Sequence, residues 1–319
     1  MVMVETARGP IDTESLGTTL MHEHVFVLNE EIRVNYPAGW DEDDRVDDAI
    51  LKLNALAKRG CRTIVDPTVI GLGRDIGRII RVADGTSLNI IVATGVYTYD
   101  DVPFYFRYRG PRNGGLDPMA QLFIDDLTTG IAGTQVKAAL LKCAIDEPGM
   151  TPGVERVLRA VCQAHAETGA PVTVHTHPGS FTGRAVLDVL RAENADLRKV
   201  VLGHSGDSTD LDYLSELADA GCLLGMDRFG LDLITSFEDR VATVAAMCER
   251  GYADRMVLSH DAACHIDWFP AGVVPRFAPA WHFEHLFDDV LPALRERGVT
   301  ESQIHAMLVE NPRRYFSGN

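Results

Sequence analysis

The chain has 319 residues, which is enough for one large α/β barrel or for two ordinary domains. Its formal net charge of -16 argues against nucleic acid and anionic membranes as partners, because both require clusters of Lys and Arg. We therefore expect a ligand that is neutral, or one that is bound through a local positive group such as a metal ion.

The sequence shows no export or membrane signal. A basic segment followed by an apolar one is missing near residue 1, and no apolar run approaches about 18 residues. We therefore expect a cytoplasmic protein. The six cysteines form no C-x-x-C pair and lie mostly in apolar runs, so we expect free thiols. They are Cys61, Cys143, Cys162, Cys222, Cys248 and Cys264.

Short apolar runs alternate with longer amphipathic stretches along the chain. The runs predict strands at 18–27, 61–69, 88–97, 138–145, 171–177, 199–205, 222–229 and 255–262. Apolar residues at i, i+3 and i+4 predict helices between them, for example at 46–60, 151–169, 208–221 and 237–251. Eight strands with eight connections predict an α/β fold of the (β/α)8 TIM-barrel type, which we expect to form a single domain over residues 1–319.

A doubly wound sheet is the alternative fold, and it is suggested by the glycine-rich stretch GLGRDIG. Gly71, Gly73 and Gly77 follow a predicted strand and precede a predicted helix. The third glycine comes too late for the dinucleotide-binding motif, and no acidic residue completes the βαβ unit downstream. We therefore interpret this stretch as a structural loop and not as a nucleotide site.

Polar residues gather near the carboxyl ends of the predicted strands, which form the catalytic end of such a barrel. In chain order they are His22, His24, Lys142, His175, His177, His204, Arg228 and Asp261. Since residues i and i+2 of a strand point the same way, His22 and His24 should face the site together while Glu23 faces away. A single buried histidine is more often structural, but imidazoles and a carboxylate from several strands suit Zn, Co, Fe or Mn. Strand spacing leaves the choice between His175 and His177 open.

Lys142 decides which type of metal site is expected. An ammonium group would be repelled by divalent cations, so its pKa should fall or it should pair elsewhere. A neutral lysine can react with carbon dioxide to give a carbamate, which supplies the bridging carboxylate that two metal ions need. The structural alternative is a lysine whose stem is buried and whose amine reaches solvent.

These residues resemble the amidohydrolase superfamily, and specifically its phosphotriesterase-like lactonases. The resemblance rests on the H-x-H of the first strand, the lysine of LLKCAIDEPG, the histidines of TVHTH and LGHSGD, and the aspartate of LSHDAACHIDW. It extends over nearly the whole chain through VDPTVIGLGRDI, DVPFYF, MDRFGLD and ENPRRYF.

The resemblance implies a binuclear centre with two divalent metal ions. His22, His24 and Asp261 would bind the more buried ion, and His175 and His204 the more exposed one. Carboxylated Lys142 and a hydroxide would bridge both ions. The resemblance also selects His175 over His177 as the ligand. It implies that His260, which precedes Asp261, faces away from the metal site. His165, His265, His282, His285 and His305 are then expected to be structural or to lie on the surface.

The same resemblance bears on the substrate. Tyr97, Tyr99 and Arg228 are expected near the metals as substrate contacts, with Tyr97 oriented toward a lactone ring. Arg228 stands where dedicated phosphotriesterases typically place a histidine, which favours a lactonase. Asp207 matches a position associated with proton release.

The loop 264–283 carries Trp268, Phe269, Phe277 and Trp281, and its aromatic side chains could line an apolar channel. Packing on the barrel or at a dimer contact is the structural alternative. Within the resemblance the loop shapes the pocket, and Trp268 is the expected substrate contact. A homodimer is implied as well.

The expected function is a quorum-quenching lactonase acting on lipophilic lactones such as N-acyl homoserine lactones, with promiscuous hydrolysis of phosphotriesters such as paraoxon. Asp261, Tyr97 and Arg228 would carry the catalytic roles, and Asp261 would accept the proton of the hydroxide. Two alternatives stay open. One is another hydrolase of the superfamily that acts on organophosphates, sugar lactones or amides. The other is a non-catalytic scaffold, which the complete set of ligands disfavours.

Overall fold

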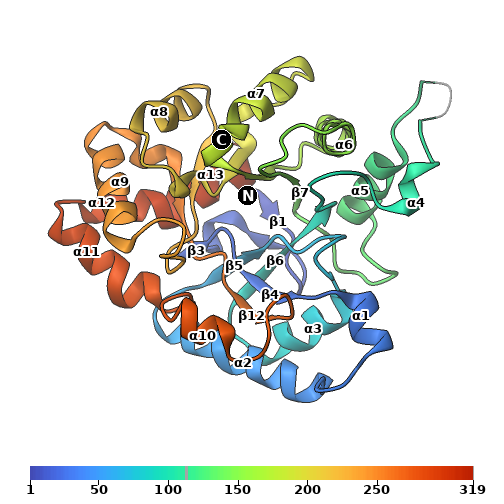
Figure 1. Ribbon diagram of the computed structural model, residues 1–319, viewed down its shortest axis with the longest axis horizontal. Helices are drawn as coiled ribbons and strands as arrows, with labels where there is room; N and C mark the ends of the chain where they lie inside the picture. The colour runs from blue at the N-terminus through green and yellow to red at the C-terminus, as the bar shows by residue number, and fades with distance from the viewer. Residues whose placement is uncertain (112–113, 319) are drawn as a thin grey trace.

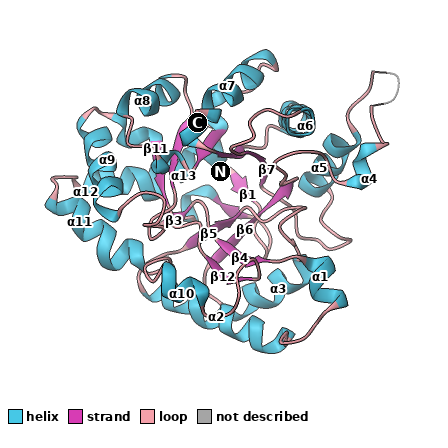
Figure 2. Cartoon of the chain, in the orientation of Figure 1, coloured by secondary structure: helices cyan, strands magenta, loops and turns pink. Residues whose placement is uncertain are grey.

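The computed structural model describes residues 1–111 and 114–318. Within these residues, parallel strands form a barrel, and helices surround it (Figures 1 and 2). The strands are β3 (Thr19–Leu20), β4 (His24–Val27), β5 (Thr63–Asp66), β6 (Asn89–Gly95), β7 (Leu140–Ile145), β8 (Val172–Thr176), β9 (Val200–Gly203), β10 (Leu223–Met226), β11 (Met256–Leu258) and β12 (Ala263–Ile266). A short antiparallel hairpin, β1 (Met3–Val4) and β2 (Ile11–Asp12), precedes them.

The helices follow the strands in the expected alternation. They are α1 (Glu30–Asn35), α2 (Glu42–Lys58), α3 (Ile76–Gly85), α4 (Phe104–Arg107), α5 (Pro118–Thr128), α6 (Pro152–Thr168), α7 (Thr182–Ala192), α8 (Leu211–Asp219), α9 (Phe237–Glu249), α10 (Val273–Phe277), α11 (Leu291–Glu296), α12 (Glu301–His305) and α13 (Asn311–Ser317). Most begin at a side-chain cap, as Asp41 caps α2 and Thr151 caps α6. The predicted TIM barrel is confirmed.

The barrel closes between its first and eighth strand positions, and both of these positions are interrupted. The first consists of β3 and β4, and the eighth of β11 and β12. One continuous sheet runs from β3 through β5 to β11, and parallel pairing of β4 with β12 completes the ring. His22 and Asp261 lie at the two interruptions, where the Asp261 N–H donates to the His22 carbonyl at 3.0 Å. The first predicted strand is therefore broken at the histidine pair and does not end there.

The barrel strands are buried on both faces, which explains their nearly continuous apolar sequences. On β5, β6 and β7, residues such as Ile64, Ile90 and Leu141 face the helices and join the large outer core. Their neighbours Val65, Ile91 and Leu140 join a smaller cluster that also contains Tyr315 and Phe316 of α13. This inner cluster fills the barrel, and the polar side chains lie beyond it at the carboxyl ends of the strands.

The glycine-rich stretch is a structural loop, as interpreted above. Gly71 and Gly73 have φ of 97° and 81°, a region that disfavours other residues. A Cβ on Gly71 would lie 2.3 Å from the Tyr97 carbonyl oxygen, and one on Gly73 would lie 2.3 Å from that of Leu28. The loop is therefore wedged between the loops that follow the first and third strand positions, and it supports the backbone of Tyr97.

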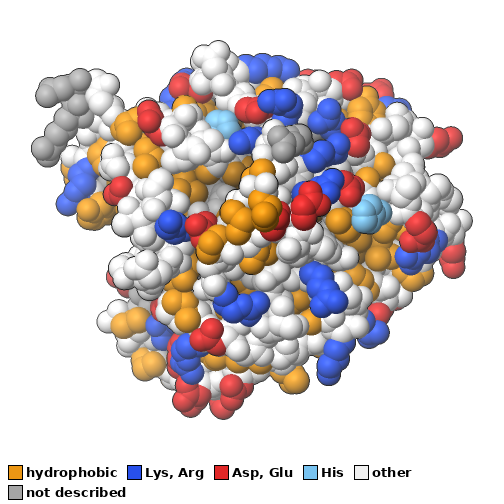
Figure 3. All heavy atoms as spheres, turned by 180° about the vertical axis from the view of Figure 1, so that it is seen from behind, with side chains coloured by type: hydrophobic (Ala, Val, Ile, Leu, Met, Phe, Trp, Pro, Cys, Tyr) orange, Lys and Arg blue, Asp and Glu red, His pale blue; other side chains and the backbone are white. Residues whose placement is uncertain are grey.

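None of the helices in residues 1–111 and 114–318 is long and apolar enough to cross a membrane. On the face seen from behind, acidic, basic and apolar side chains are interspersed (Figure 3). Exposed ion pairs such as Arg184 with Glu216, at 2.7 Å, contribute little to stability. The fold therefore depends mainly on its two apolar clusters.

Candidate metal centre

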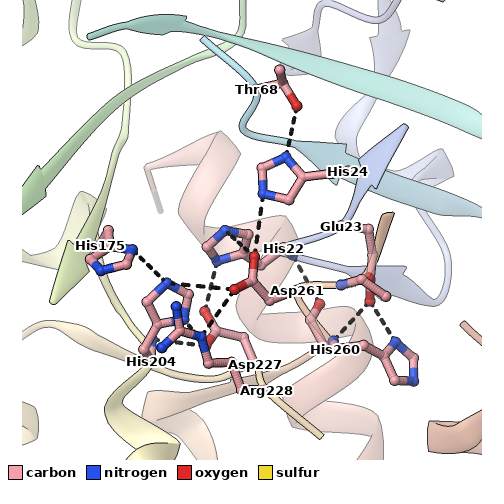
Figure 4. Close-up of polar contacts among 12 residues, drawn as sticks. His22, Glu23, His24, Thr68, His175, His204, Asp227, Arg228, His260 and Asp261 are labelled. Carbon is pink, nitrogen blue, oxygen red and sulfur yellow. Dashed lines mark hydrogen bonds and ion pairs between the residues drawn. The ribbon is translucent and has the colours of Figure 1, made fainter. Parts of the chain in front are cut away.

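His22, His24 and Asp261 come together at the mouth of the barrel. The Nε2 atoms of His22 and His24 each lie 3.3 Å from Asp261 Oδ1. The three side chains offer ligand atoms within 4.8 Å of one another. Figure 4 shows the Asp261 carboxylate directed at both rings. Two imidazole nitrogens and a carboxylate oxygen are a donor set that fits a divalent ion of the zinc type.

Asp261 is held in an unusual backbone conformation by a residue on the first strand position. Its φ is 56°, which is uncommon for a residue other than glycine. Glu23 points away from the site, and its carboxylate accepts the N–H groups of His260 at 2.9 Å and Ala262 at 3.1 Å. Glu23 thus binds the residues on both sides of Asp261, and His260 faces away as expected.

Lys142 is fully enclosed, with 1% of its surface exposed. Its Nζ lies 3.4 Å from His22 Nε2, and it makes no ion pair with a carboxylate in the part of the chain that the structure describes. Burial lowers the pKa of this amine to about 8. A Cβ on Gly95 would lie 1.8 Å from the Lys142 carbonyl oxygen, so a glycine is required beside this strand. The structure excludes the alternative in which the amine reaches solvent.

His175 and His204 form the second half of the cluster. His175 Nδ1 lies 2.9 Å from His204 Nε2, and both rings are buried. Burial lowers the pKa of His175 to about 4, so the ring is neutral, as a metal ligand must be. His177 bonds Ser180 Oγ at 2.8 Å and does not line the cavity. The geometry therefore places His175, and not His177, beside the other candidate ligands.

Asp227 connects the two halves from below, and sequence reasoning missed it. Its Oδ2 lies 2.9 Å from His22 Nδ1, and its Oδ1 lies 3.0 Å from His204 Nδ1. A carboxylate bound to Nδ1–H leaves Nε2 of each ring free to bind metal. Gly225 makes this possible, because a Cβ there would lie 2.5 Å from Asp227 Oδ2. Asp227 precedes Arg228 in the sequence, but no motif or regular spacing relates it to His22 or His204.

Asp227→Asn is expected to weaken metal binding and kcat/KM by about 10- to 100-fold. The amide NH2 would donate to His22 Nδ1 and so place the ring proton on Nε2, where the metal should bind. Metal content after dialysis and kcat/KM check this expectation. Asp212→Asn is a matched control, because Asp212 is exposed on α8. Unchanged metal affinity in Asp227→Asn would contradict the role assigned to Asp227.

Two more acidic residues orient ligand histidines. Asp146 bonds His175 Nε2, which leaves Nδ1 directed into the site. Asp66 acts on His24 through Thr68, whose Oγ1 lies 2.7 Å from His24 Nδ1 and 2.5 Å from Asp66 Oδ1. Asp146 follows Lys142 by four residues and comes directly after the end of β7, and this spacing was the only signal for it in the sequence.

A cavity of about 230 Å³ opens above these ligands. Tyr97, Tyr99, Arg228 and Trp268, the four expected substrate contacts, all line it. Tyr97 and Tyr99 are bonded through their hydroxyls, and the Tyr97 hydroxyl lies 3.4 Å from His175 Nδ1. Burial raises the pKa of Tyr97 far above its usual range, so its hydroxyl keeps its proton.

The remaining wall of the cavity is mainly apolar. It is formed by Val27, Leu72, Leu231, Ile234, Ala263, Ile266, Phe269 and Trp281. Of the aromatic loop, Trp268, Phe269 and Trp281 face the cavity. Phe277 is 55% exposed on α10 and does not line the cavity. Trp281 also donates from its indole nitrogen to the His260 carbonyl at 2.8 Å.

Arg228 extends the polar cluster away from the ligands. Its Nε donates to Asp261 Oδ2 at 3.0 Å, and its Nη1 donates to Asp207 Oδ2 at 2.9 Å. Burial alone would raise the pKa of Asp261, but the neighbouring His22 and His204 help to hold it well below its usual range. Asp261 is thus a carboxylate, as a metal ligand requires.

Comparisons with known proteins give a consistent result. Residues 2–316 match the model of the phosphotriesterase family. An aryldialkylphosphatase of Saccharolobus solfataricus is 40% identical over 309 residues, which cover 96% of this chain and 97% of the relative. A solved phosphotriesterase structure from Mycobacterium tuberculosis has 59% identity and a TM-score of 0.96, with 98% of each chain covered. A second solved structure comes from work on engineering organophosphate hydrolysis from a weak promiscuous lactonase template. It has 31% identity and a TM-score of 0.88, with 98% of this chain and 99% of that chain covered.

Proposed function

Because the chain belongs to the phosphotriesterase family, which consists of metal-dependent hydrolases of the amidohydrolase superfamily, we propose that it hydrolyses lipophilic lactones such as N-acyl homoserine lactones. Slow hydrolysis of phosphotriesters such as paraoxon would be a side activity. The observation that carries the proposal is the apolar cavity directly above the histidine, lysine and aspartate cluster. The neighbour described as a weak promiscuous lactonase template also supports it.

The family generally uses a binuclear divalent metal centre, and the chain offers residues for both ions. In our proposal His22, His24 and Asp261 hold the more buried ion, and His175 and His204 hold the more exposed one. When bound, the ions would lower the pKa of a water molecule and polarise the substrate carbonyl.

Lys142 would join the two halves as a carbamate. Its neutral amine attacks the carbon of carbon dioxide, an N–C bond forms, one C–O π bond breaks, and one N–H proton leaves to solvent. The product is a carboxylate at a buried position where, among the described residues, an ammonium group would have no carboxylate to pair with. Lys142 Nζ lies 3.4 Å from His22 Nε2. Lys142 also lines the same cavity as His175 and His204, so the carboxylate would be available to the residues of both halves.

Tyr97 and Asp261 would act on the lactone, and Arg228 would orient Asp261. Tyr97 would donate from its hydroxyl to the ring and hold the ester in place. Asp261 would accept the proton of the attacking water and deliver it to the leaving alkoxide. Arg228 stays charged, and its bond to Asp261 Oδ2 keeps that carboxylate oriented toward the site.

An acyl chain would lie along the apolar wall. Leu231, Ile234 and Trp268 line the cavity and are contributed by the loops that follow β10 and β12. Burial of an alkyl chain against this wall contributes roughly 0.8 kcal/mol of binding free energy per CH2 group. This wall favours lactones with long alkyl chains over small, polar lactones.

The proposal is tested by kcat/KM for a long-chain N-acyl homoserine lactone and for paraoxon, measured on one metal-reconstituted preparation. We expect kcat/KM to be at least about 100-fold higher for the lactone. A site built for a planar ester stabilises the transition state of lactone hydrolysis more than that of phosphotriester hydrolysis. A reversed ratio would favour the second candidate function, an organophosphate phosphotriesterase, which the name of the Saccharolobus relative also suggests. Turnover of neither substrate with metal bound would contradict both.

A further inference from the structure

Arg240 is a buried cation that the proposed mechanism does not use. It lies on α9, outside the barrel, and 2% of its surface is exposed. Its guanidinium donates to the carbonyl oxygens of Thr235 at 3.1 Å, Gly206 at 2.9 Å and Leu231 at 3.3 Å. A buried guanidinium is costly unless its donors are satisfied, so three backbone acceptors indicate a specific structural task.

These acceptors belong to two different loops at the carboxyl end of the barrel. Gly206 follows β9, whereas Leu231 and Thr235 follow β10. A second bond joins the same loops, since Thr235 Oγ1 donates to the Asp207 carbonyl at 3.0 Å. Arg240 therefore ties the β9 loop to the β10 loop from behind.

Both tied loops contribute to the candidate site. Leu231 and Ile234 form part of the apolar wall. Asp207 lies between two arginines, 2.9 Å from Arg228 Nη1 and 2.7 Å from Arg240 Nη2. Its Oδ1 has no aligned hydrogen-bond donor among the described residues, so the charge of Arg240 is what compensates this oxygen. Asp261, Arg228, Asp207 and Arg240 thus form a row of side chains in which negative and positive charges alternate.

We infer that Arg240 is a positioning residue that sets the preference for long alkyl chains, because it fixes the Leu231–Ile234 wall and the Arg228 side chain at the same time. The inference rests on the proposed lactonase function for its substrate. A lysine would keep the charge, but its compact ammonium group cannot span three carbonyl groups in two loops. The positive charge alone is therefore not enough to hold the two loops together.

Arg240→Lys tests the inference, with Arg250→Lys as the matched control at the end of the same helix. Arg250 is 40% exposed and pairs with the exposed Asp212. In Arg240→Lys we expect KM for a dodecanoyl homoserine lactone to rise by about fivefold or more, while KM for the butanoyl lactone changes by less than about twofold. Hydrogen exchange at the amides of Leu231 and Ile234 should become about tenfold faster. The control should match the wild type in every respect.

An equal effect on both lactones, or unchanged exchange in the β10 loop, would overturn the inference. If Arg240→Lys does not fold, Thr235→Val removes only the second tie between the loops and should change KM and exchange in the same direction. If the wild-type protein hydrolyses no lactone, the proposed function fails, and the exchange measurement still decides whether Arg240 holds the loop.

Discussion

Replacing His22 with alanine is expected to abolish hydrolysis and to reduce metal content while the barrel stays folded. The His22 imidazole contacts Asp261, Lys142 and Asp227. Loss of an ion from the site removes several kcal/mol of transition-state stabilisation, so kcat/KM should fall by about 1000-fold or more. Metal analysis after dialysis and kcat/KM on the lactone check this result.

His177→Ala is the control for His22→Ala. His177 lies on the loop after β8, bonds the nearby Ser180 and Thr182, and is not among the residues that line the cavity. Its replacement should leave metal content and kcat/KM close to those of the wild type. Full activity and full metal content in His22→Ala would show that His22 is not a metal ligand.

Lys142→Met is expected to separate activity from stability. Methionine has a similar length and fills the buried position without a charge, so the free energy of unfolding should stay the same or increase. Without an amine no carbamate can form, and kcat/KM should fall by about 1000-fold or more because the two ions lose their shared ligand. Thermal unfolding of the metal-free protein and kcat/KM of the reconstituted protein give the two readouts.

Two outcomes would argue against the carbamate. One is retention of activity in Lys142→Met. The other is an activity in the wild-type protein that does not depend on carbon dioxide when the metal centre is rebuilt. A carbamate also predicts that 13C-labelled carbon dioxide is incorporated during reconstitution and that the label is missing from Lys142→Met.

The local sequence was sufficient for the elements and for most of the candidate ligands. Each barrel strand is a short apolar run, and His175 and His204 lie near the carboxyl end of β8 and directly after β9, as the barrel requires. Lys142 instead lies within β7, and His24 begins β4. The two-residue period of a strand placed His22 and His24 on one side and Glu23 on the other, and the structure confirms this placement. The expected homodimer stays a prediction, which sedimentation of the purified protein would test.

Other features depend on contacts between segments that lie far apart in the chain. The interruption of the first strand position follows from bonds across the barrel closure, between residues 22–24 and residues 259–262. No local pattern carries that information. The aromatic loop is similar, since Trp281 reaches the cavity and Phe277 does not, although both looked equivalent in the sequence.

What the sequence by itself determined is the barrel and most of the candidate ligands at its mouth, because hydrophobic period and residue type are local properties. What only the tertiary structure decided is which carboxylates and cations support that chemistry. Asp227 reaches His22 over 205 residues, and Arg240 reaches Gly206 over 34. Such pairs form because desolvated polar groups must find partners wherever the fold brings them, and sequence distance does not limit that search.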